Sequence, residues 1–251
     1  MNCNAKLSDG ILVLENTLIR RELTWNNGLP STRTLLDKRS GFRWEMPGMI
    51  PDCDLPGAPA AGSASAGALQ VTERAATVLA PAHLEAEVVG RRGGVEIRRV
   101  FRIYPDCPAI AAECHVRGRP DHSWKDEKVD EEAWRDVERA KKFRKKPPPI
   151  PVAERVVLAG RPAAARAVEF HDVTDYCNNL VESRSVALSR LPVALRGNLL
   201  LVTERLGGGG FFVLREAPCS DRQLAWPGCD FAADRWEVTV LGLGVNPEDI
   251  R

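Results

Sequence analysis

Apolar and polar residues alternate with a period of two over many short stretches of this chain. In residues 95–103, four apolar side chains share one parity: Val95, Ile97, Phe101 and Ile103. Arg99 has the same parity and is the exception. Because successive side chains of a strand point to opposite faces, the pattern predicts a β-strand with one apolar face.

A second alternating run follows a turn sequence. Residues 104–108 read Tyr-Pro-Asp-Cys-Pro, which is typical of a turn. After it, the residues on one parity are Ile110, Ala112, Cys114 and Val116, and those on the other are Glu113, His115 and Arg117. The two runs together predict a β-hairpin with one solvated face.

Shorter runs of the same kind cover much of the rest of the chain: residues 11–14, 18–25, 32–36, 84–88, 199–202, 211–214 and 236–240. Turn sequences separate them, among them Asn26-Asn27-Gly28 and the four glycines at 207–210. No Lys-Ser/Thr follows these glycines, which favours a hairpin turn over a phosphate-binding loop. We expect a mainly β chain that forms a large antiparallel β-sandwich over a single domain, residues 1–251.

Two segments interrupt the strand pattern. Residues 51–68 are rich in Pro, Gly, Ala and Ser and predict a flexible surface loop. In residues 121–150, acidic side chains come first, basic ones follow, and Pro147-Pro148-Pro149 comes near the end. That order complements a helix dipole and predicts an inserted charged α-helix with a Pro-rich linker.

The charge balance offers no broad electrostatic field for a partner. Lys and Arg number 35 against 34 Asp and Glu, for a formal net charge of +1, so we expect neither nucleic acid nor a membrane surface as a partner. The chain has no long apolar run, which favours a cytoplasmic location. Its seven cysteines show no Cys-x-x-Cys and its four histidines are scattered, so we expect reduced thiols, no metal site and no cofactor.

A group of carboxylates near the end of the chain is the best candidate for chemistry. Glu216, Asp221 and Asp230 are close in sequence to Trp226, and a glycosidase needs two carboxyl groups about 5–10 Å apart. An aromatic ring such as that of Trp226 can stack on a sugar. The alternative is a loop pinned by Asp221 and Arg222, with Trp226 packed on the sandwich or on a neighbouring domain, and the sequence leaves both open.

Four segments resemble a known family when they are taken in order. They are residues 12–36 with Asn-Gly-Leu-Pro-Ser-Thr-Arg-Thr-Leu-Leu-Asp-Lys-Arg, 99–116 with Phe-Arg-Ile-Tyr-Pro-Asp-Cys-Pro-Ala-Ile, 173–188, and 207–243. They are similar to the amino-terminal β-supersandwich domain of melibiase-type α-galactosidases, glycoside hydrolase family thirty-six, which has a galactose-mutarotase-like fold. In that family the catalytic aspartates lie on a following (β/α)₈ barrel, and its catalytic motifs have no counterpart in these 251 positions.

The resemblance implies a non-catalytic amino-terminal portion of an α-galactosidase-like enzyme. Such a domain packs on the barrel, helps homo-oligomers form and contributes loop residues to the rim of an α-galactoside pocket. The residues expected at a carbohydrate or domain interface are Trp25, Asn26, Asp221, Arg222, Trp226 and Asp230.

Two other functions remain open at this point. One is a stand-alone carbohydrate-binding or interaction module. The other is a small aldose-mutarotase-like enzyme that uses His171 or His115 with Glu216.

Overall fold

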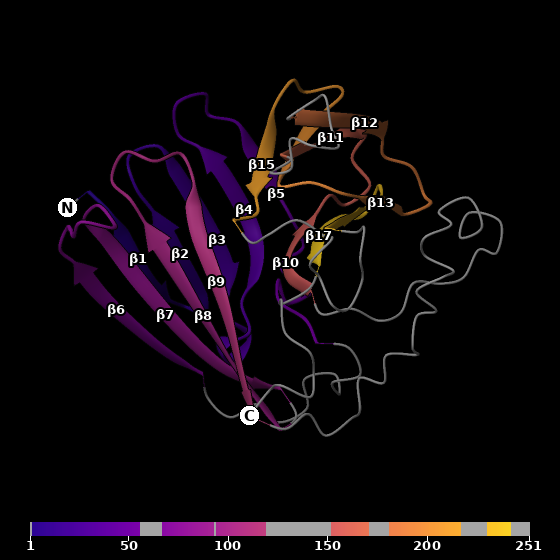
Figure 1. Ribbon diagram of the computed structural model, residues 1–251. Helices are drawn as coiled ribbons and strands as arrows, with labels where there is room; N and C mark the ends of the chain where they lie inside the picture. Colours follow the sequence, from indigo (N-terminus) through magenta and orange to yellow (C-terminus); the bar gives the residue numbers. More distant parts are fainter. Residues whose placement is uncertain are drawn as a thin grey trace, which may run out of the picture.

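The computed structural model describes residues 2–55, 67–92, 94–118, 152–170, 181–216 and 230–241. Over these ranges the protein is mainly β, with strands β1 to β17 in four antiparallel sheets (Figure 1). The predicted β-sandwich class is therefore confirmed. The predicted helix and linker at 121–150 lie outside the described residues.

Sheet I is formed by the first five strands, which pair in chain order. They are β1 (Asn4–Ser8), β2 (Ile11–Glu15), β3 (Ile19–Thr24), β4 (Ser31–Asp37) and β5 (Arg43–Glu45). A short 3₁₀ turn, η1 (Asn26–Gly28), joins β3 to β4, and Asn26, Asn27 and Gly28 have φ values of 45°, 54° and 84°. Asn and Gly tolerate this left-handed conformation better than other residues, which explains why the Asn-Asn-Gly signal correctly predicted a tight turn.

Sheet II contains the next four strands, also in chain order. They are β6 (Ala68–Arg74), β7 (His83–Arg92), β8 (Val95–Ile103) and β9 (Ile110–Gly118). The predicted hairpin is confirmed as β8 and β9, which pair from Val95↔Gly118 to Ile103↔Ile110. Sheets I and II face each other across a first core that includes Leu12, Leu14 and Leu23 from one side and Leu84, Val88 and Phe101 from the other.

The second half of the described chain forms a second sandwich beside the first (Figure 1). Sheet III has the order β10 (Val152–Val157), β17 (Glu237–Leu241), β16 (Phe231–Ala233) and β13 (Val193–Leu195). Sheet IV has the order β12 (Val181–Ala187), β11 (Ala163–Phe170), β14 (Leu199–Glu204) and β15 (Gly210–Leu214). The glycine-rich stretch lies in the β14–β15 hairpin, as its context predicted.

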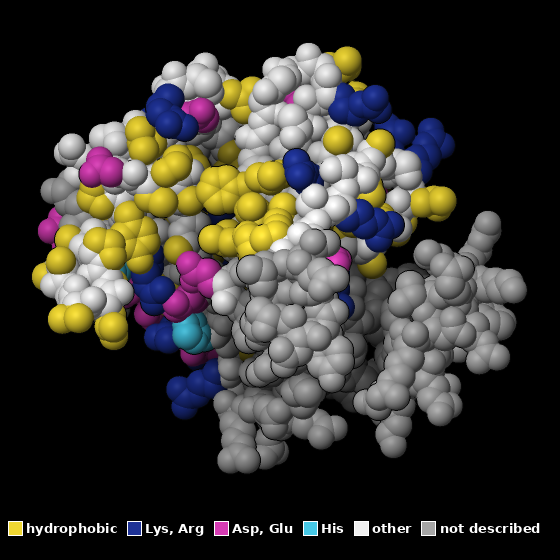
Figure 2. All heavy atoms as spheres, turned by 45° about the horizontal axis from the view of Figure 1, so that its top comes forward, with side chains coloured by type: hydrophobic (Ala, Val, Ile, Leu, Met, Phe, Trp, Pro, Cys, Tyr) yellow, Lys and Arg dark blue, Asp and Glu magenta, His cyan; other side chains and the backbone are white. Residues whose placement is uncertain are grey.

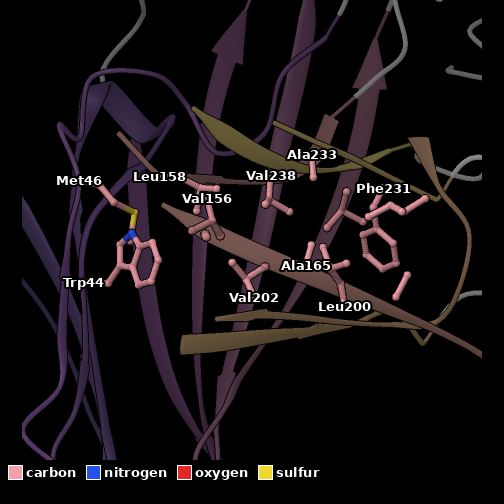
Figure 3. Close-up of a cluster of buried hydrophobic side chains, with 14 residues drawn as sticks. Trp44, Met46, Val156, Leu158, Ala165, Leu200, Val202, Phe231, Ala233 and Val238 are labelled. Carbon is pink, nitrogen blue, oxygen red and sulfur yellow. The ribbon is translucent and has the colours of Figure 1, made fainter. Parts of the chain in front are cut away.

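Trp44 joins the two sandwiches. Its strand, β5, belongs to sheet I, but its ring is 1% exposed and lies in the core between sheets III and IV (Figure 3). The ring meets Phe211 edge-on with 5.3 Å between centroids, and its Nε1 donates a hydrogen bond to the Val157 carbonyl at 3.3 Å. Trp44, together with Leu35 of β4 and the neighbouring Phe42 and Met46, thus contributes to the core of the second sandwich.

The stretch 51–55, which we call the 51–55 connection, differs from the expected surface loop. Asp52, Cys53 and Leu55 are only 2%, 4% and 2% exposed. Asp54 and Val152 exchange backbone hydrogen bonds of 2.9 and 2.8 Å, which ties the connection to β10. The backbone polar groups of Asp54 are therefore satisfied inside the protein, as a buried segment requires.

Candidate functional site

The densest group of buried charges in the described structure lies between the two sandwiches. We call it the junction cluster: Arg21 on β3, Thr32 on β4, Asp52 in the 51–55 connection, Arg99 on β8 and Glu154 on β10. Two guanidinium groups face two carboxylates, so the cluster is neutral as a whole. Arg99 is 1% exposed, which is tolerable for a charge only when it is paired.

Glu154 is the centre of this arrangement. One of its carboxylate oxygens accepts a hydrogen bond from Arg21 and the other accepts one from Arg99. Arg21 also donates to Asp52 Oδ2 at 2.8 Å, and the Thr32 backbone N–H donates to Asp52 Oδ1 at 2.8 Å. Residues from both sandwiches and from the 51–55 connection, which runs from sheet I to sheet II, therefore share one hydrogen-bonded network.

The pKa values of the two carboxyl groups are shifted in opposite directions. Burial acts to raise the pKa of Glu154, but the attraction of Arg21 and Arg99 outweighs it and lowers the pKa below its ordinary value. For Asp52, burial is the largest effect and raises the pKa, in spite of Arg21 and the hydrogen bonds from Thr32. The cluster therefore pairs two buried arginines with the carboxylates of Asp52 and Glu154.

The lowered pKa of Glu154 predicts a pH dependence of stability. The stabilisation from its carboxylate is present above the unfolded-state pKa of about 4.3 and is lost as the pH falls through the lower folded-state value. The difference in unfolding free energy between the wild type and Glu154→Gln should therefore shrink as the pH falls from about 6 to about 3. Asp52 contributes with the opposite sign, because a raised pKa stabilises at low pH, but it is present in both proteins. Urea unfolding at several pH values measures the difference, and a gap that stays constant would contradict this assignment.

A pair of thiols adjoins the junction cluster. Cys53 in the 51–55 connection and Cys114 on β9 have their sulfur atoms 3.3 Å apart. Cys114 is the direct cross-strand partner of Arg99. The Nε and one terminal nitrogen of Arg99 are buried and have no hydrogen-bond partner in the described structure.

Asp230, one of the predicted site residues, lies inside the second sandwich. It is 0% exposed, forms an ion pair with Arg215 and accepts a hydrogen bond of 2.9 Å from the Gly197 backbone N–H. These contacts fix the loops beside β13, β15 and β16. The other residues predicted near it, Asp221, Arg222 and Trp226, lie outside the described residues.

Trp25 and Asn26 lie together at the η1 turn of the first sandwich. The Trp25 ring is partly buried against the first core, and its backbone N–H donates to the Gly10 carbonyl at 2.8 Å. Asn26 Nδ2 donates to Ser31 Oγ at 2.6 Å. Their part in a carbohydrate or domain interface stays a prediction.

Sheet IV exposes an apolar outer face, which we call the sheet IV apolar face. It consists of Phe170, Val181, Leu201, Phe212 and Leu214, which are 47%, 52%, 37%, 44% and 52% exposed. Cross-strand pairing brings Phe170 opposite Val181 and Leu201 opposite Phe212. On the face of the protein shown in Figure 2, hydrophobic side chains form a band across the middle.

The outer face of sheet II has the opposite character. Arg74 and Glu85 form an ion pair of 2.6 Å, Arg98 and Glu87 one of 3.3 Å, and Arg102 pairs with Glu113. These ion pairs are partly exposed on the surface and can be hydrated. The two sandwiches thus present different chemistry to their surroundings.

A shallow polar hollow lies on the outer face of sheet I, over β1 to β3. Among the side chains that line it are Lys6, Glu15, Arg20 and Glu22. Burial acts to raise the pKa of Glu15, but hydrogen bonds from Lys38 and Asn4 outweigh it and lower the pKa. Glu15 and Glu22 are both ion-paired to Arg20, so these three charges of the hollow satisfy one another.

Comparison with known proteins finds no protein-family model that matches the chain and no curated protein that matches it significantly. Within the described ranges, no group of three or more His, Cys, Asp or Glu side chains is placed to hold a metal ion. No helix among the same residues is long and apolar enough to cross a bilayer.

Proposed function

We propose that this chain is the non-catalytic β-sandwich portion of an α-galactosidase-like glycoside hydrolase in the cytoplasm. In this function it supports a catalytic (β/α)₈ barrel, takes part in homo-oligomers and contributes to the rim of an α-galactoside pocket. The observation that carries the proposal is the sheet IV apolar face. Exposed apolar side chains that gather on one face of a sheet are typical of a surface that another protein domain covers.

The surroundings of Asp52, Glu154 and Asp230 support a scaffolding function. A glycosidase needs two carboxyl groups that flank a substrate, with room for the sugar between them. Asp52 and Glu154 are instead both bound to Arg21 between the sandwiches, and Asp230 is fully buried against Arg215. We therefore assign bond cleavage to the barrel. The four described cysteines are free thiols, in keeping with the cytoplasm.

The test combines the chain with a separately produced catalytic barrel of an α-galactosidase. Light scattering after size exclusion should show a complex, and Phe212→Asp should weaken it at least tenfold, because a buried unpaired carboxylate would replace an apolar contact. Val78→Asp is the matched control, since Val78 is fully exposed and lies between β6 and β7, away from sheet IV. It should leave the affinity unchanged.

The activity of the chain alone completes the test. Purified chain should not hydrolyse a nitrophenyl α-galactoside. Turnover by the chain itself, failure to bind the barrel, or equal binding by Phe212→Asp and wild type would each reject the proposal.

A further inference from the structure

The sulfur atoms of Cys53 and Cys114 are close enough to react with each other. They are 3.3 Å apart, and a disulfide forms at about 2.05 Å, so a shift of about 1.2 Å joins them. The two residues are 61 positions apart in the chain and belong to different elements. Their contact is therefore a product of the tertiary fold.

The two thiols have unequal surroundings. Cys114 is partly exposed on β9, which is an edge strand of sheet II, whereas Cys53 is 4% exposed. The hydrogen bond from the Cys53 thiol, helped by the charge of Arg99, lowers the pKa of Cys114, and the same hydrogen bond together with burial raises that of Cys53 well above its usual range. Cys114 is thus the more exposed of the two thiols and the one whose pKa is lowered, and thiolates are the reactive form.

Arg99 supplies a second, independent observation. It lies directly across from Cys114 in the β8–β9 pairing, and two of its buried nitrogen atoms lack hydrogen-bond partners in the described structure. An unpartnered buried donor is costly, and an anion beside it relieves that cost. A thiolate on Cys114 is such an anion.

From this geometry we propose that Cys53 and Cys114 are a reversible disulfide site whose oxidant is a small-molecule disulfide of the glutathione type. The Cys114 thiolate attacks one sulfur of the oxidant, forms a mixed disulfide and releases one glutathione thiolate. The Cys53 thiol then loses its proton and attacks the Cys114 sulfur, which releases the second glutathione thiolate. Two protein thiols and one oxidised glutathione become one protein disulfide and two reduced glutathiones.

The bond would fasten the 51–55 connection to sheet II. Cys53 lies between Asp52, which binds Arg21, and Asp54, which forms a bridge with Val152 of β10. Closing the loop between Cys53 and Cys114 restricts the unfolded chain and holds the junction between the sandwiches in place. This consequence does not depend on the proposed glycoside hydrolase function.

The test treats the full chain with oxidised glutathione and then digests it without reductant. Mass spectrometry should find the Cys53 peptide linked to the Cys114 peptide, and reduced glutathione should reverse the link. The thermal midpoint should rise by about 5–15 °C on oxidation, as expected for a loop of this length.

Single variants separate this pair from the other thiols. Cys114→Ser and Cys53→Ser should each abolish the rise in midpoint, while Cys107→Ser, the matched control, should keep it. Links between other cysteines, a stable glutathione adduct on Cys114, or an unchanged thiol content would overturn the proposal. Peptide mapping of the wild type decides the matter even if a variant fails to fold.

Discussion

Replacement of Glu154 by Gln should lower the free energy of unfolding by about 3–5 kcal/mol at neutral pH. Glu154 is the carboxylate that binds both Arg21 and Arg99, and Arg99 is 1% exposed. The amide of Gln is neutral and nearly the same size, so the variant keeps the packing and leaves one positive charge of the cluster unbalanced. Urea unfolding followed by circular dichroism measures the loss.

Glu113→Gln is the matched control, because it removes the same kind of Glu–Arg ion pair at a more exposed position. Glu113 also pairs with an arginine, Arg102, but its side chain is 43% exposed on the outer face of sheet II. Solvent screens such a pair, and the loss should stay below about 1 kcal/mol. Similar losses in the two variants would show that the buried cluster has no special weight in the stability of the protein.

The strands could be predicted from the sequence because their signal is local. Alternation over residues 95–116 predicted the β8–β9 hairpin, and Asn26-Asn27-Gly28 predicted the turn before β4. In both cases the local conformation depends on residues that are close together in the chain. The period-two pattern also predicted that these strands would bury one face.

The sequence contains only one indication of the junction cluster. It is Arg99, which lies among the apolar residues on the inner face of its strand. A charged residue on an inner face needs a buried partner, so its position alone indicates an ion pair inside the protein. The partner, Glu154, is 55 residues away and lies in the other sandwich. Only the packing of the two sandwiches identifies it.

The burial of the 51–55 connection could not be predicted because of the composition of the residues that follow it in the chain. Residues 56–68 supply most of the Ala, Gly and Ser that predicted a flexible surface loop. The preceding residues, Asp52 and Asp54, bind Arg21 and Arg92, and Cys53 contacts Cys114. Composition averaged over a window therefore concealed a five-residue segment in which Asp52, Cys53 and Leu55 are buried.

The neutrality of the cluster also bears on how the sandwiches meet. Apolar contacts such as that of Trp44 are non-directional, so the ion pairs of the cluster add a constraint on the relative position of the two sandwiches. A shifted position would leave Arg21, Arg99 or Glu154 buried without a partner, at a cost of several kcal/mol. The observed arrangement is the one in which every charge of the cluster has an opposite charge beside it.

The second large effect is expected for Trp44→Ala, with a loss of about 3–5 kcal/mol in unfolding free energy. The ring is 1% exposed, and the variant removes its contacts with Phe42 and Phe211 and its hydrogen bond to Val157. Because β5 belongs to sheet I, the cavity weakens the link between the sandwiches as well as the core of the second one. Thermal and urea unfolding measure the loss, and near-ultraviolet circular dichroism follows the change in packing.

Two further variants make the reason for this loss testable. Trp44→Phe keeps an aromatic ring in the core and should recover more than half of the loss, because ring burial contributes more than one hydrogen bond. Trp236→Ala removes an equally large ring that is 51% exposed, and its effect should be below about 1 kcal/mol. If Trp236→Ala were as damaging as Trp44→Ala, burial of Trp44 between the sheets would not be what holds the two sandwiches together.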